Sequence, residues 1–265
     1  MRPAAPSVSL RASVVVPARD EEDLISACLQ ALAGQRGVAP EEYEVLLVLD
    51  RCTDGTGARA AEVAADHPGL RLYALEGPGA GSGLARRVGM EAACKRLMAV
   101  RGSDGLICST DADTVVAPDW LASQLRAVAS GAKAIGGRIG LADTGSLPPG
   151  VLRLHAEEGR RRHERLLADP ARSGRAEHWQ FSGASLALTA ETYREVGGLR
   201  PLESLEDEHL EEALRQSGVP IERLLSVRVT TSPRLEGRAS RGLSHDLSCM
   251  TVLHQGSTVL RRQQD

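Results

Sequence analysis

Two carboxylates directly follow a short apolar run in the stretch Leu106-Ile107-Cys108-Ser109-Thr110-Asp111-Ala112-Asp113. A buried strand that ends in an Asp-X-Asp turn carries two hard oxygen ligands to the carboxyl edge of a sheet, where they can hold Mg²⁺ or Mn²⁺ against a diphosphate. Aspartates are also common in turns because they bond to the local backbone, so the tripeptide alone is a weak indication of a metal. The segments around it decide between the two interpretations.

The same order of apolar run, polar turn and helical segment repeats through the first half of the chain. The apolar runs are residues 13–16, 45–49, 70–75 and 106–108. Apolar residues at helical spacing follow each run, and the four acids at 20–23 are expected in the first turn of the first helix. Strands that alternate with helices at this pitch predict an α/β fold with a mainly parallel sheet between flanking helices. Ligands bind at the carboxyl ends of the strands in such a sheet.

The second half of the chain predicts a smaller, mixed region. Residues 143–150 form a linker rich in Gly, Pro and Ser, and residues 151–167 read as a charged helix. The later elements are a strand at 181–188, helices at 190–196 and 206–216, a strand at 221–231 and a C-terminal helix from 243. The arginines at 160–162 fit a solvated helix face better than a contact with an anionic or membrane-bound acceptor.

The composition is that of a folded chain and excludes several protein classes. Its 265 residues are 42% hydrophobic, enough for the core of one large α/β domain. A net charge of −3 gives no concentrated basic face, so nucleic acid is not an expected partner. Five scattered cysteines without a Cys-X-X-Cys pair indicate reduced thiols. Without a signal-peptide core or the ~20 apolar residues of a transmembrane segment, we expect a cytoplasmic protein, with peripheral contact at the inner membrane face left open.

Seven short segments in one order resemble the family-2 glycosyltransferases of GT-A fold. They are Val14-Val15-Val16-Pro17-Ala18-Arg19-Asp20-Glu21-Glu22, Asp50-Arg51-Cys52-Thr53-Asp54-Gly55-Thr56, Gly79-Ala80-Gly81-Ser82-Gly83-Leu84-Ala85-Arg86-Arg87, Asp111-Ala112-Asp113, Gly183-Ala184-Ser185, Gly197-Gly198 and Glu206-Asp207. Each segment is weak alone, but seven in the family's order are hard to obtain by accident. The resemblance implies one GT-A domain, in which residues 1–140 form a Rossmann-like nucleotide-sugar half and residues 141–265 form an acceptor half with the C-terminal helix.

The resemblance implies a binding set for a UDP- or GDP-linked sugar. Its members are Pro17, Ala18, Arg19, Glu21, Asp50, Gly79, Gly81, Gly83, Arg86, Asp111, Ala112 and Asp113. In the family, the end of the first strand cradles the nucleobase and ribose, and the residue at Asp50 contacts the base. Glycines allow close approach of ribose or phosphate, although glycine in a surface loop needs no ligand. Asp54 fits helix capping better than ligand contact.

The resemblance also implies a Mn²⁺ or Mg²⁺ cofactor at the Asp-X-Asp turn. Asp113 would ligate the ion directly, while Asp111 would touch the ribose or reach the ion through water. The departing nucleoside diphosphate accumulates negative charge, which a divalent cation stabilises as a Lewis acid. His245 is a third candidate ligand, as a late histidine is in some GT-A enzymes, although a lone histidine on a helix is more often structural.

Glu206 and Asp207 resemble the family's Glu-Asp element beneath the acceptor. Asp207 is the predicted general base, which takes the acceptor hydroxyl proton while that oxygen attacks the anomeric carbon, and Glu206 is the second candidate. The alternative is that the helix dipole favours acids at a helix N-terminus. A set for phosphate or acceptor contact comprises Arg234, Arg238, Gly183 and Ala184, with surface ion pairing as the alternative for the arginines.

Together these residues predict transfer of a hexosyl unit to a small or lipid-linked hydroxyl acceptor, with inversion if Asp207 is the base and retention as the fallback. Only 2% of residues are aromatic, which leaves few stacking platforms for a long glycan. Ala80 stands where relatives with phosphoglycerate acceptors carry a lysine, which weakens a link to that group. The alternatives are a sugar-phosphate nucleotidyltransferase, whose longer Gly-rich signature is not matched after the first strand, and a non-catalytic nucleotide-sugar-binding protein. A homodimer is a further expectation.

Overall fold

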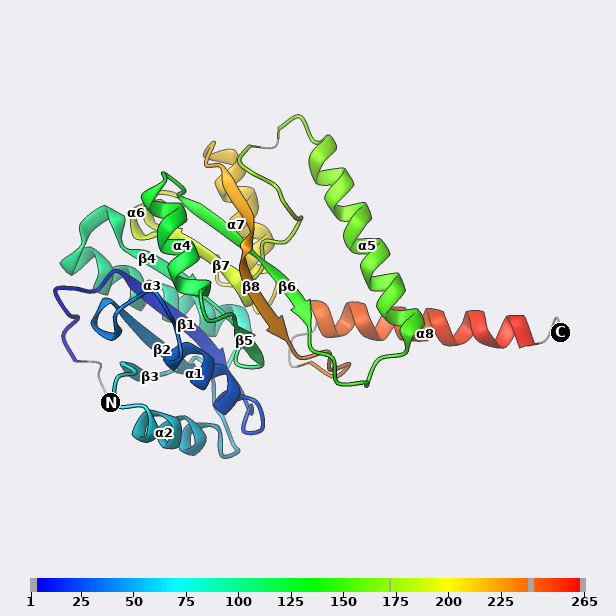
Figure 1. Ribbon diagram of the computed structural model, residues 1–265, viewed down its shortest axis with the longest axis horizontal. Helices are drawn as coiled ribbons and strands as arrows, with labels where there is room; N and C mark the ends of the chain where they lie inside the picture. The colour runs from blue at the N-terminus through cyan, green and yellow to red at the C-terminus, as the bar shows by residue number, and fades with distance from the viewer. Residues whose placement is uncertain (1–3, 172, 238–240, 263–265) are drawn as a thin grey trace.

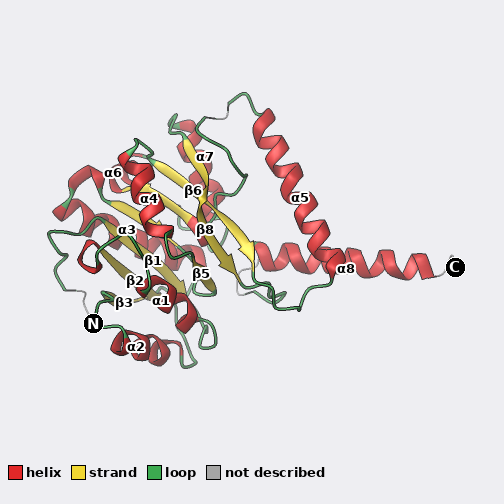
Figure 2. Ribbon diagram, viewed as in Figure 1, coloured by secondary structure: helices red, strands yellow, loops and turns green. Residues whose placement is uncertain are grey.

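The fold is built on one eight-stranded sheet within residues 4–171, 173–237 and 241–262, which the structure, a computed structural model, describes (Figures 1 and 2). The strands are β1 (Ala12–Ala18), β2 (Tyr43–Leu49), β3 (Leu72–Glu76), β4 (Leu106–Ser109), β5 (Thr114–Val116), β6 (Ala134–Leu141), β7 (Leu186–Thr189) and β8 (Ile221–Thr231). The α-helices are α1 (Ile25–Ala33), α2 (Thr56–Asp66), α3 (Ser82–Val100), α4 (Trp120–Ala129), α5 (Pro149–Ala168), α6 (Ala190–Glu195), α7 (Glu206–Gln216) and α8 (Leu243–Arg262).

The sheet has a parallel half and a mixed half. Its strand order is β3-β2-β1-β4-β7-β6-β8-β5. β1 pairs in parallel with β2 and β4, and β2 pairs in parallel with β3. β7 runs antiparallel to both β4 and β6, β6 pairs in parallel with β8, and the short β5 runs antiparallel to β8. The predicted α/β fold with a mainly parallel sheet and a mixed acceptor-side region is confirmed.

Helices bury both faces of the central strand. Every residue of β1 is buried, and alternate side chains enter different cores. Val14 and Val16 join a core that includes Trp120 of α4, whereas Val15 joins a second core that includes Met90 of α3. This burial on two faces explains why β1 is a continuous β-branched run without polar alternation. The rigid sheet fixes the ends of β1, β2 and β4, where the polar loops begin.

Two sequence expectations about the elements were wrong, and one strand was not expected. The acids at 20–23 precede α1 instead of forming its first turn, because Glu21 and Glu22 bond across to the loop at 53–56. The strand expected at 181–188 is limited to β7, because residues 183–185 form a 3₁₀ turn that leaves the sheet. The short β5 was not expected, and its pairing with the distant β8 holds it in place.

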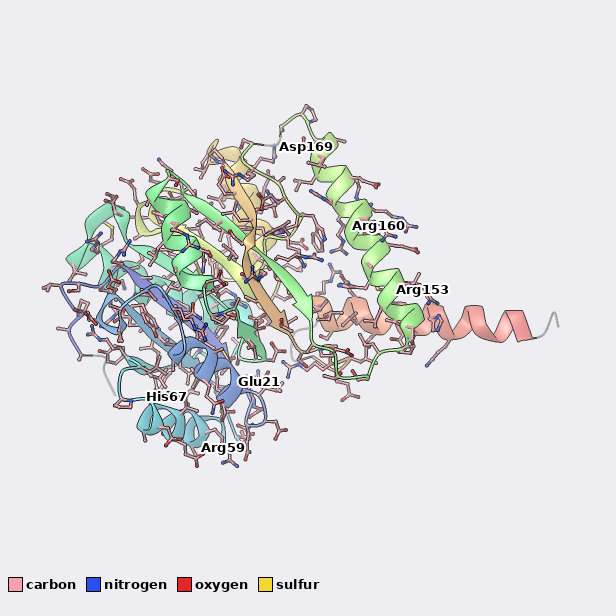
Figure 3. All side chains as sticks on the ribbon, in the orientation of Figure 1. Glu21, Arg59, His67, Arg153, Arg160 and Asp169 are labelled. Carbon is pink, nitrogen blue, oxygen red and sulfur yellow. The ribbon has the colours of Figure 1, made fainter. Side chains whose placement is uncertain are left out.

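Helices α5 and α8 project from the body of the molecule (Figure 1). They contact each other through a small apolar cluster that contains Leu147, Val151 and Leu247. Figure 3 labels Arg153 and Arg160 on the projecting α5 helix. Among the described helices, none combines the length and the apolar character needed to cross a bilayer.

Candidate active site

A cleft of about 760 Å³ lies across the carboxyl ends of β1, β2 and β4 and extends toward α5, α7 and α8. Most of the predicted site residues line it. They are Pro17, Ala18, Arg19, Glu21, Asp50, Gly81, Arg86, Asp111, Ala112, Asp113, Gly183, Ala184, Glu206, Asp207, Arg234 and His245. Gly79 and Gly83 are not among the lining residues, and Arg238 lies outside the described residues. The sheet thus gathers predictions separated by more than 200 residues into one cleft.

One corner of the cleft joins the first and last strands through Arg234. Its guanidinium donates to both carboxylate oxygens of Glu21, at 2.6 and 2.8 Å, and lies 2.8 Å from Asp113 Oδ2. The side chain of Glu21 is buried, that of Asp113 is 12% exposed and that of Arg234 is 26% exposed. Thr114 and Thr231 hydroxyls lie 3.3 and 3.4 Å from Asp113 Oδ1. Asp113 is therefore held toward the cleft, and not turned into the core.

The pKa of Asp113 reports an excess of negative charge in this corner. Burial, together with the neighbouring Asp111 and Glu21 carboxylates, raises the pKa of Asp113 to about 6, although the Arg234 guanidinium opposes this rise. Desolvation and like charges both disfavour the ionised form of a carboxyl group. A cation that binds beside Asp113 would relieve this repulsion.

A second network surrounds Arg86, which lies at the start of α3. Its guanidinium donates to Glu206 Oε1 at 2.8 Å and to Asp111 Oδ1 at 2.7 Å. The same group donates to Ser109 Oγ at 2.6 Å and to the Gly183 carbonyl at 3.1 Å. Burial alone would lower the pKa of Arg86, but the carboxylates of Asp111 and Glu206 outweigh it and raise that pKa. Arg86 is therefore committed to protein partners, which differs from the ligand contact expected from the sequence.

The residues at the Asp-X-Asp turn fit a divalent metal ion. Across the Arg234 corner and the Arg86 network, four carboxylates are paired with two guanidinium groups, so acidic groups outnumber basic groups in these networks. The carboxylates of Asp111 and Asp113 offer hard oxygens, the ligands that Mg²⁺ and Mn²⁺ prefer. Asp113 and Asp111 would hold the ion, and Arg234 would have to leave Asp113 when it binds.

His245 does not join the aspartates in a three-residue ligand group in the described part of the chain. It lies in the first turn of α8 with its side chain 56% exposed. Its Nδ1 lies 3.9 Å from Asp246 Oδ1 and 3.9 Å from Cys249 Sγ, both on the same helix. Its role as a metal ligand stays a prediction.

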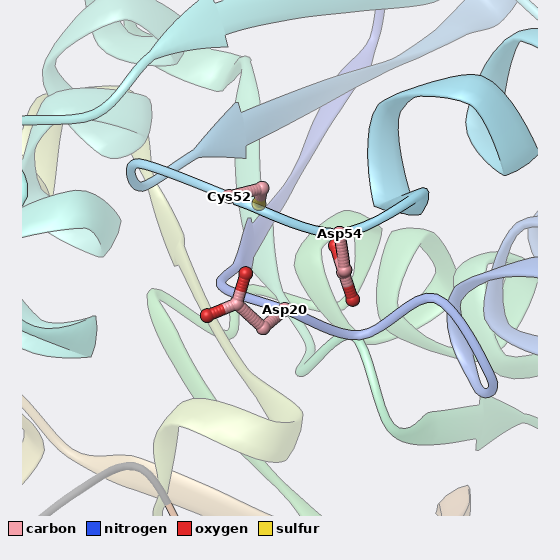
Figure 4. A group of neighbouring side chains, drawn as sticks. All are labelled: Asp20, Cys52 and Asp54. Atoms are coloured by element: carbon pink, nitrogen blue, oxygen red, sulfur yellow. The ribbon is translucent and has the colours of Figure 1, made fainter.

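Another group of metal-ligating side chains lies outside the cleft corner, at Asp20, Cys52 and Asp54 (Figure 4). Asp20 Oδ1 accepts from the Thr53 backbone at 2.7 Å, and Asp54 Oδ2 accepts from the Glu22 backbone at 3.0 Å. Cys52 Sγ lies 3.4 Å from the Ala18 carbonyl. These bonds tie the loop after β1 to the loop after β2, which accounts for the cluster without an ion. Asp54 was expected to cap the following helix, but the N-cap of α2 is Gly55, and Asp54 instead links the two loops.

Asp207 also lines the cleft and lies in the first turn of α7. Its Oδ2 accepts from the Gly183 backbone N–H at 3.0 Å, and its Oδ1 accepts from the Glu208 N–H at 3.0 Å. Its side chain is only partly buried, in contrast to that of Glu206, which is buried against Arg86. A carboxylate held by neutral donors keeps its basic lone pairs available, whereas Glu206 is paired with a cation. The geometry therefore favours Asp207 over Glu206 as a base.

The glycine loop packs against protein instead of leaving room for a ligand at every glycine. Gly79 and Gly81 have φ values of +73° and +105°, which favour glycine. Asp50 accepts from both of their N–H groups, so this carboxylate shapes the loop. A Cβ at Gly83 would lie 2.7 Å from Glu206 Oε2 and would also collide with the Leu202 carbonyl. A sugar or phosphate was expected to approach these glycines closely. At Gly83, residues 202–206 of the protein occupy that space instead.

Two residues, Trp179 in the cleft and Ser109 behind it as a partner of Arg86, escaped the sequence-based site prediction. Ser109 ends β4 and accepts from Arg86, but nothing in a single serine marks such a partner. Trp179 lines the acceptor side of the cleft, where the Arg162 guanidinium lies 4.8 Å from its ring. In a chain with few aromatics, a tryptophan close before the Gly183 segment was a usable signal.

The comparisons with known proteins agree with this geometry. The model of glycosyl transferase family 2 matches residues 13–177, more than half of the chain. The chain belongs to glycosyl transferase family 2. It is therefore a glycosyltransferase, and its sheet is the GT-A arrangement of that class. Comparison with curated protein sequences gives no match.

Solved structures show the same fold at low sequence identity. The mannosyltransferase PcManGT from Pyrobaculum calidifontis, in complex with GDP-Man and Mn²⁺, has a TM-score of 0.61 and 19% identity, over 97% of this chain and 66% of that one. S. aureus TarS residues 1–349 with UDP-GlcNAc gives a TM-score of 0.60 and 16% identity, over 89% and 69%. The same segment with UDP gives 0.59 and 16%, over 89% and 68%. This family 2 chain thus spans about two thirds of the length of PcManGT and of the TarS segment, and 41% of the longer S. aureus TarS chain.

Proposed function

We propose that this family 2 glycosyltransferase moves a hexosyl unit from a UDP- or GDP-sugar to a small or lipid-linked hydroxyl acceptor, with Mn²⁺ or Mg²⁺ as cofactor. One observation carries the proposal: the carboxylates of Asp113 and Asp207, which follow β4 and begin α7, line the same cleft. The first has the surroundings of a metal ligand, and the second has those of a base. The solved neighbours with GDP-Man and Mn²⁺ or with UDP-GlcNAc support this class of donor.

At the donor end, the protein supplies fixed charge for a diphosphate. A bound divalent cation stabilises the negative charge of the departing diphosphate as a Lewis acid. Arg234 supplies positive charge beside Asp113, and its side chain is partly exposed and belongs to the loop after β8. Guanidinium groups bind phosphate oxygens bidentately, so Arg234 can turn from Asp113 to the diphosphate. The nucleobase and ribose lie, in this proposal, along Pro17, Ala18 and Asp50.

At the acceptor end, Asp207 takes the proton from the attacking hydroxyl. The N–H groups of Gly183 and Glu208 fix the orientation of its carboxylate. Attack from this end, opposite the diphosphate, inverts the anomeric carbon. The Trp179 ring offers one apolar face for a small acceptor, in line with the few aromatics of the chain. The division into a donor half at 1–140 and an acceptor half at 141–265 follows the same reasoning.

Isothermal titration calorimetry tests the proposal. UDP and GDP are titrated into the enzyme with and without Mn²⁺, and the Asp113→Asn variant is compared with Asp119→Asn, an exposed aspartate that pairs with Arg228. We expect one nucleotide to bind at least tenfold more tightly with Mn²⁺, and only Asp113→Asn to lose this gain. Equal affinity with and without the metal for both nucleotides would refute the proposal. Cytoplasmic location and a homodimer stay predictions, to be tested by fractionation and light scattering.

A further inference from the structure

Arg86 is the most completely engaged charged residue of the cleft. Its side chain is only 5% exposed, and four hydrogen bonds use its three nitrogens. An arginine has five N–H donors in a rigid planar fork, so this site uses nearly all of its capacity. Such a group has little left to offer a substrate. Its function must therefore be sought in the partners that it holds.

These partners belong both to the segment of the proposed metal ligand and to the segments around the proposed base. Asp111 and Ser109 lie at the end of β4, beside the proposed metal ligand Asp113. Glu206 and the Gly183 carbonyl lie on the acceptor side. The same Gly183 peptide region is held a second time, because its N–H donates to Asp207 Oδ2 at 3.0 Å. One rigid guanidinium therefore spans the distance between the donor carboxylates and the base.

The surrounding residues leave no room for a different arrangement. A Cβ at Gly183 would collide with the Arg86 guanidinium, and a Cβ at Gly83 would lie 2.7 Å from Glu206 Oε2. Both positions are glycine in this chain. The close packing restricts Arg86 and Glu206 to the observed geometry.

We propose that Arg86 is a positioning residue that fixes the Asp207 base relative to the donor-side carboxylates. The inference rests on the proposed function and deepens it. Inversion by direct displacement needs the acceptor oxygen in line with the anomeric carbon and the departing diphosphate. Misplacement of a reacting group by about 1 Å can cost about 100-fold in rate. Arg86 would set this alignment without touching donor or acceptor.

The Arg86→Lys variant tests the inference because lysine keeps the positive charge but lacks the planar guanidinium group with its five N–H donors. A single ammonium cannot reach the four partners at once, so Asp111 and Gly183 lose their common anchor. We expect transfer to an acceptor to fall about 100-fold in kcat, with the Kd of the nucleotide in the presence of Mn²⁺ changed less than about threefold. Hydrolysis of the donor by water, which needs no aligned acceptor, should fall less, so the ratio of transfer to hydrolysis drops.

The matched control is Arg87→Lys on the next residue of α3. Arg87 is exposed and pairs with Glu91 on the same helix at 2.7 Å, so this variant should keep the wild-type ratio of transfer to hydrolysis. Ser109→Ala removes one acceptor from Arg86 and serves if Arg86→Lys does not fold. It should lower the same ratio by a smaller factor.

The outcomes separate the inference from the function on which it rests. An unchanged ratio of transfer to hydrolysis in folded Arg86→Lys, with Mn²⁺-dependent nucleotide binding intact in the wild type, would overturn the positioning role alone. Loss of nucleotide binding in Arg86→Lys without loss of fold would overturn it as well, in favour of direct ligand contact. Absence of Mn²⁺-dependent nucleotide binding in the wild type would instead refute the proposed function.

Discussion

Replacing Asp207 with asparagine removes the proposed base while changing almost nothing in shape. The carboxylate accepts two backbone N–H groups, from Gly183 and Glu208. Asparagine has one carbonyl oxygen, so it can keep one of these bonds and must turn its NH₂ toward the other donor. Loss of one partly exposed hydrogen bond costs about 1 kcal/mol, which for a chain of this size lowers Tm by roughly 2–4 °C.

The expected effect on catalysis is much larger than the effect on stability. Removal of a general base typically costs about 10²- to 10⁴-fold in rate, equivalent to about 3–5.5 kcal/mol of activation free energy. The neighbouring acid should behave in the opposite way. Glu206→Gln breaks one buried ion pair of Arg86, which costs about 3 kcal/mol of stability and roughly 5–10 °C in Tm.

Steady-state transfer kinetics and thermal unfolding measure the two quantities on the same samples. Glu212→Gln is the control, because Glu212 lies on the same helix and pairs at the surface with Arg215. It should keep kcat within about twofold of the wild type. If folded Asp207→Asn retains more than about a tenth of wild-type kcat, Asp207 is not the base. A Tm loss in Asp207→Asn that matches that of Glu206→Gln would show that its carboxylate is structural.

Three further predictions concern the stability of the protein and the place of the metal ion. His178 is buried, and its pKa is lowered to about 4, so the free energy of unfolding falls as the pH drops below the ordinary histidine pKa of about 6.5. Between about pH 7 and about pH 4, His178→Asn should therefore lose about 3 kcal/mol less unfolding free energy than the wild type, measured by urea unfolding. Equal losses in the two proteins would contradict this. Gly83→Ala should lower the unfolding free energy by about 1–3 kcal/mol, because the added Cβ would collide with Glu206. Gly140→Ala is the control and should be nearly neutral, because its Cβ would meet only an atom at 3.7 Å. Similar Tm values for the two variants would contradict the close packing at Gly83. Asp54→Ala should lower Tm but leave Mn²⁺ affinity within about twofold by calorimetry, and loss of Mn²⁺ binding would place the ion at the loop cluster.

The parallel half of the fold could be predicted because its strands are buried on both faces. The valines of β1 lie within a continuous apolar run, and this run is visible in the sequence without any partner. Strand β5 could not be found in this way, since three residues carry no period and the strand depends on β8. The start of α1 was also misplaced, because the acids before it bond to a loop more than 30 residues away.

Most residues that line the cleft were among those predicted from the sequence, but their pairing was not predicted. Asp111, Asp113 and Asp207 line one cleft, as their places at a strand end and a helix start indicated. Arg234 pairs with Glu21 across 213 residues, and no local pattern specifies such a contact. For the same reason, the sequence assigned Arg86 to the ligand, whereas its four hydrogen bonds go to protein groups brought together only by folding.

The position of the bound metal ion most directly tests the proposal that Asp113 ligates the ion beside the diphosphate. Crystals grown with Mn²⁺ and UDP or GDP can be measured at a wavelength where manganese scatters anomalously. The account predicts an anomalous peak within coordination distance of Asp113 and of the diphosphate, with Arg234 moved away from Asp113. A peak at Asp20, Cys52 and Asp54 instead, or nucleotide bound in the cleft with no peak at Asp113, would contradict it.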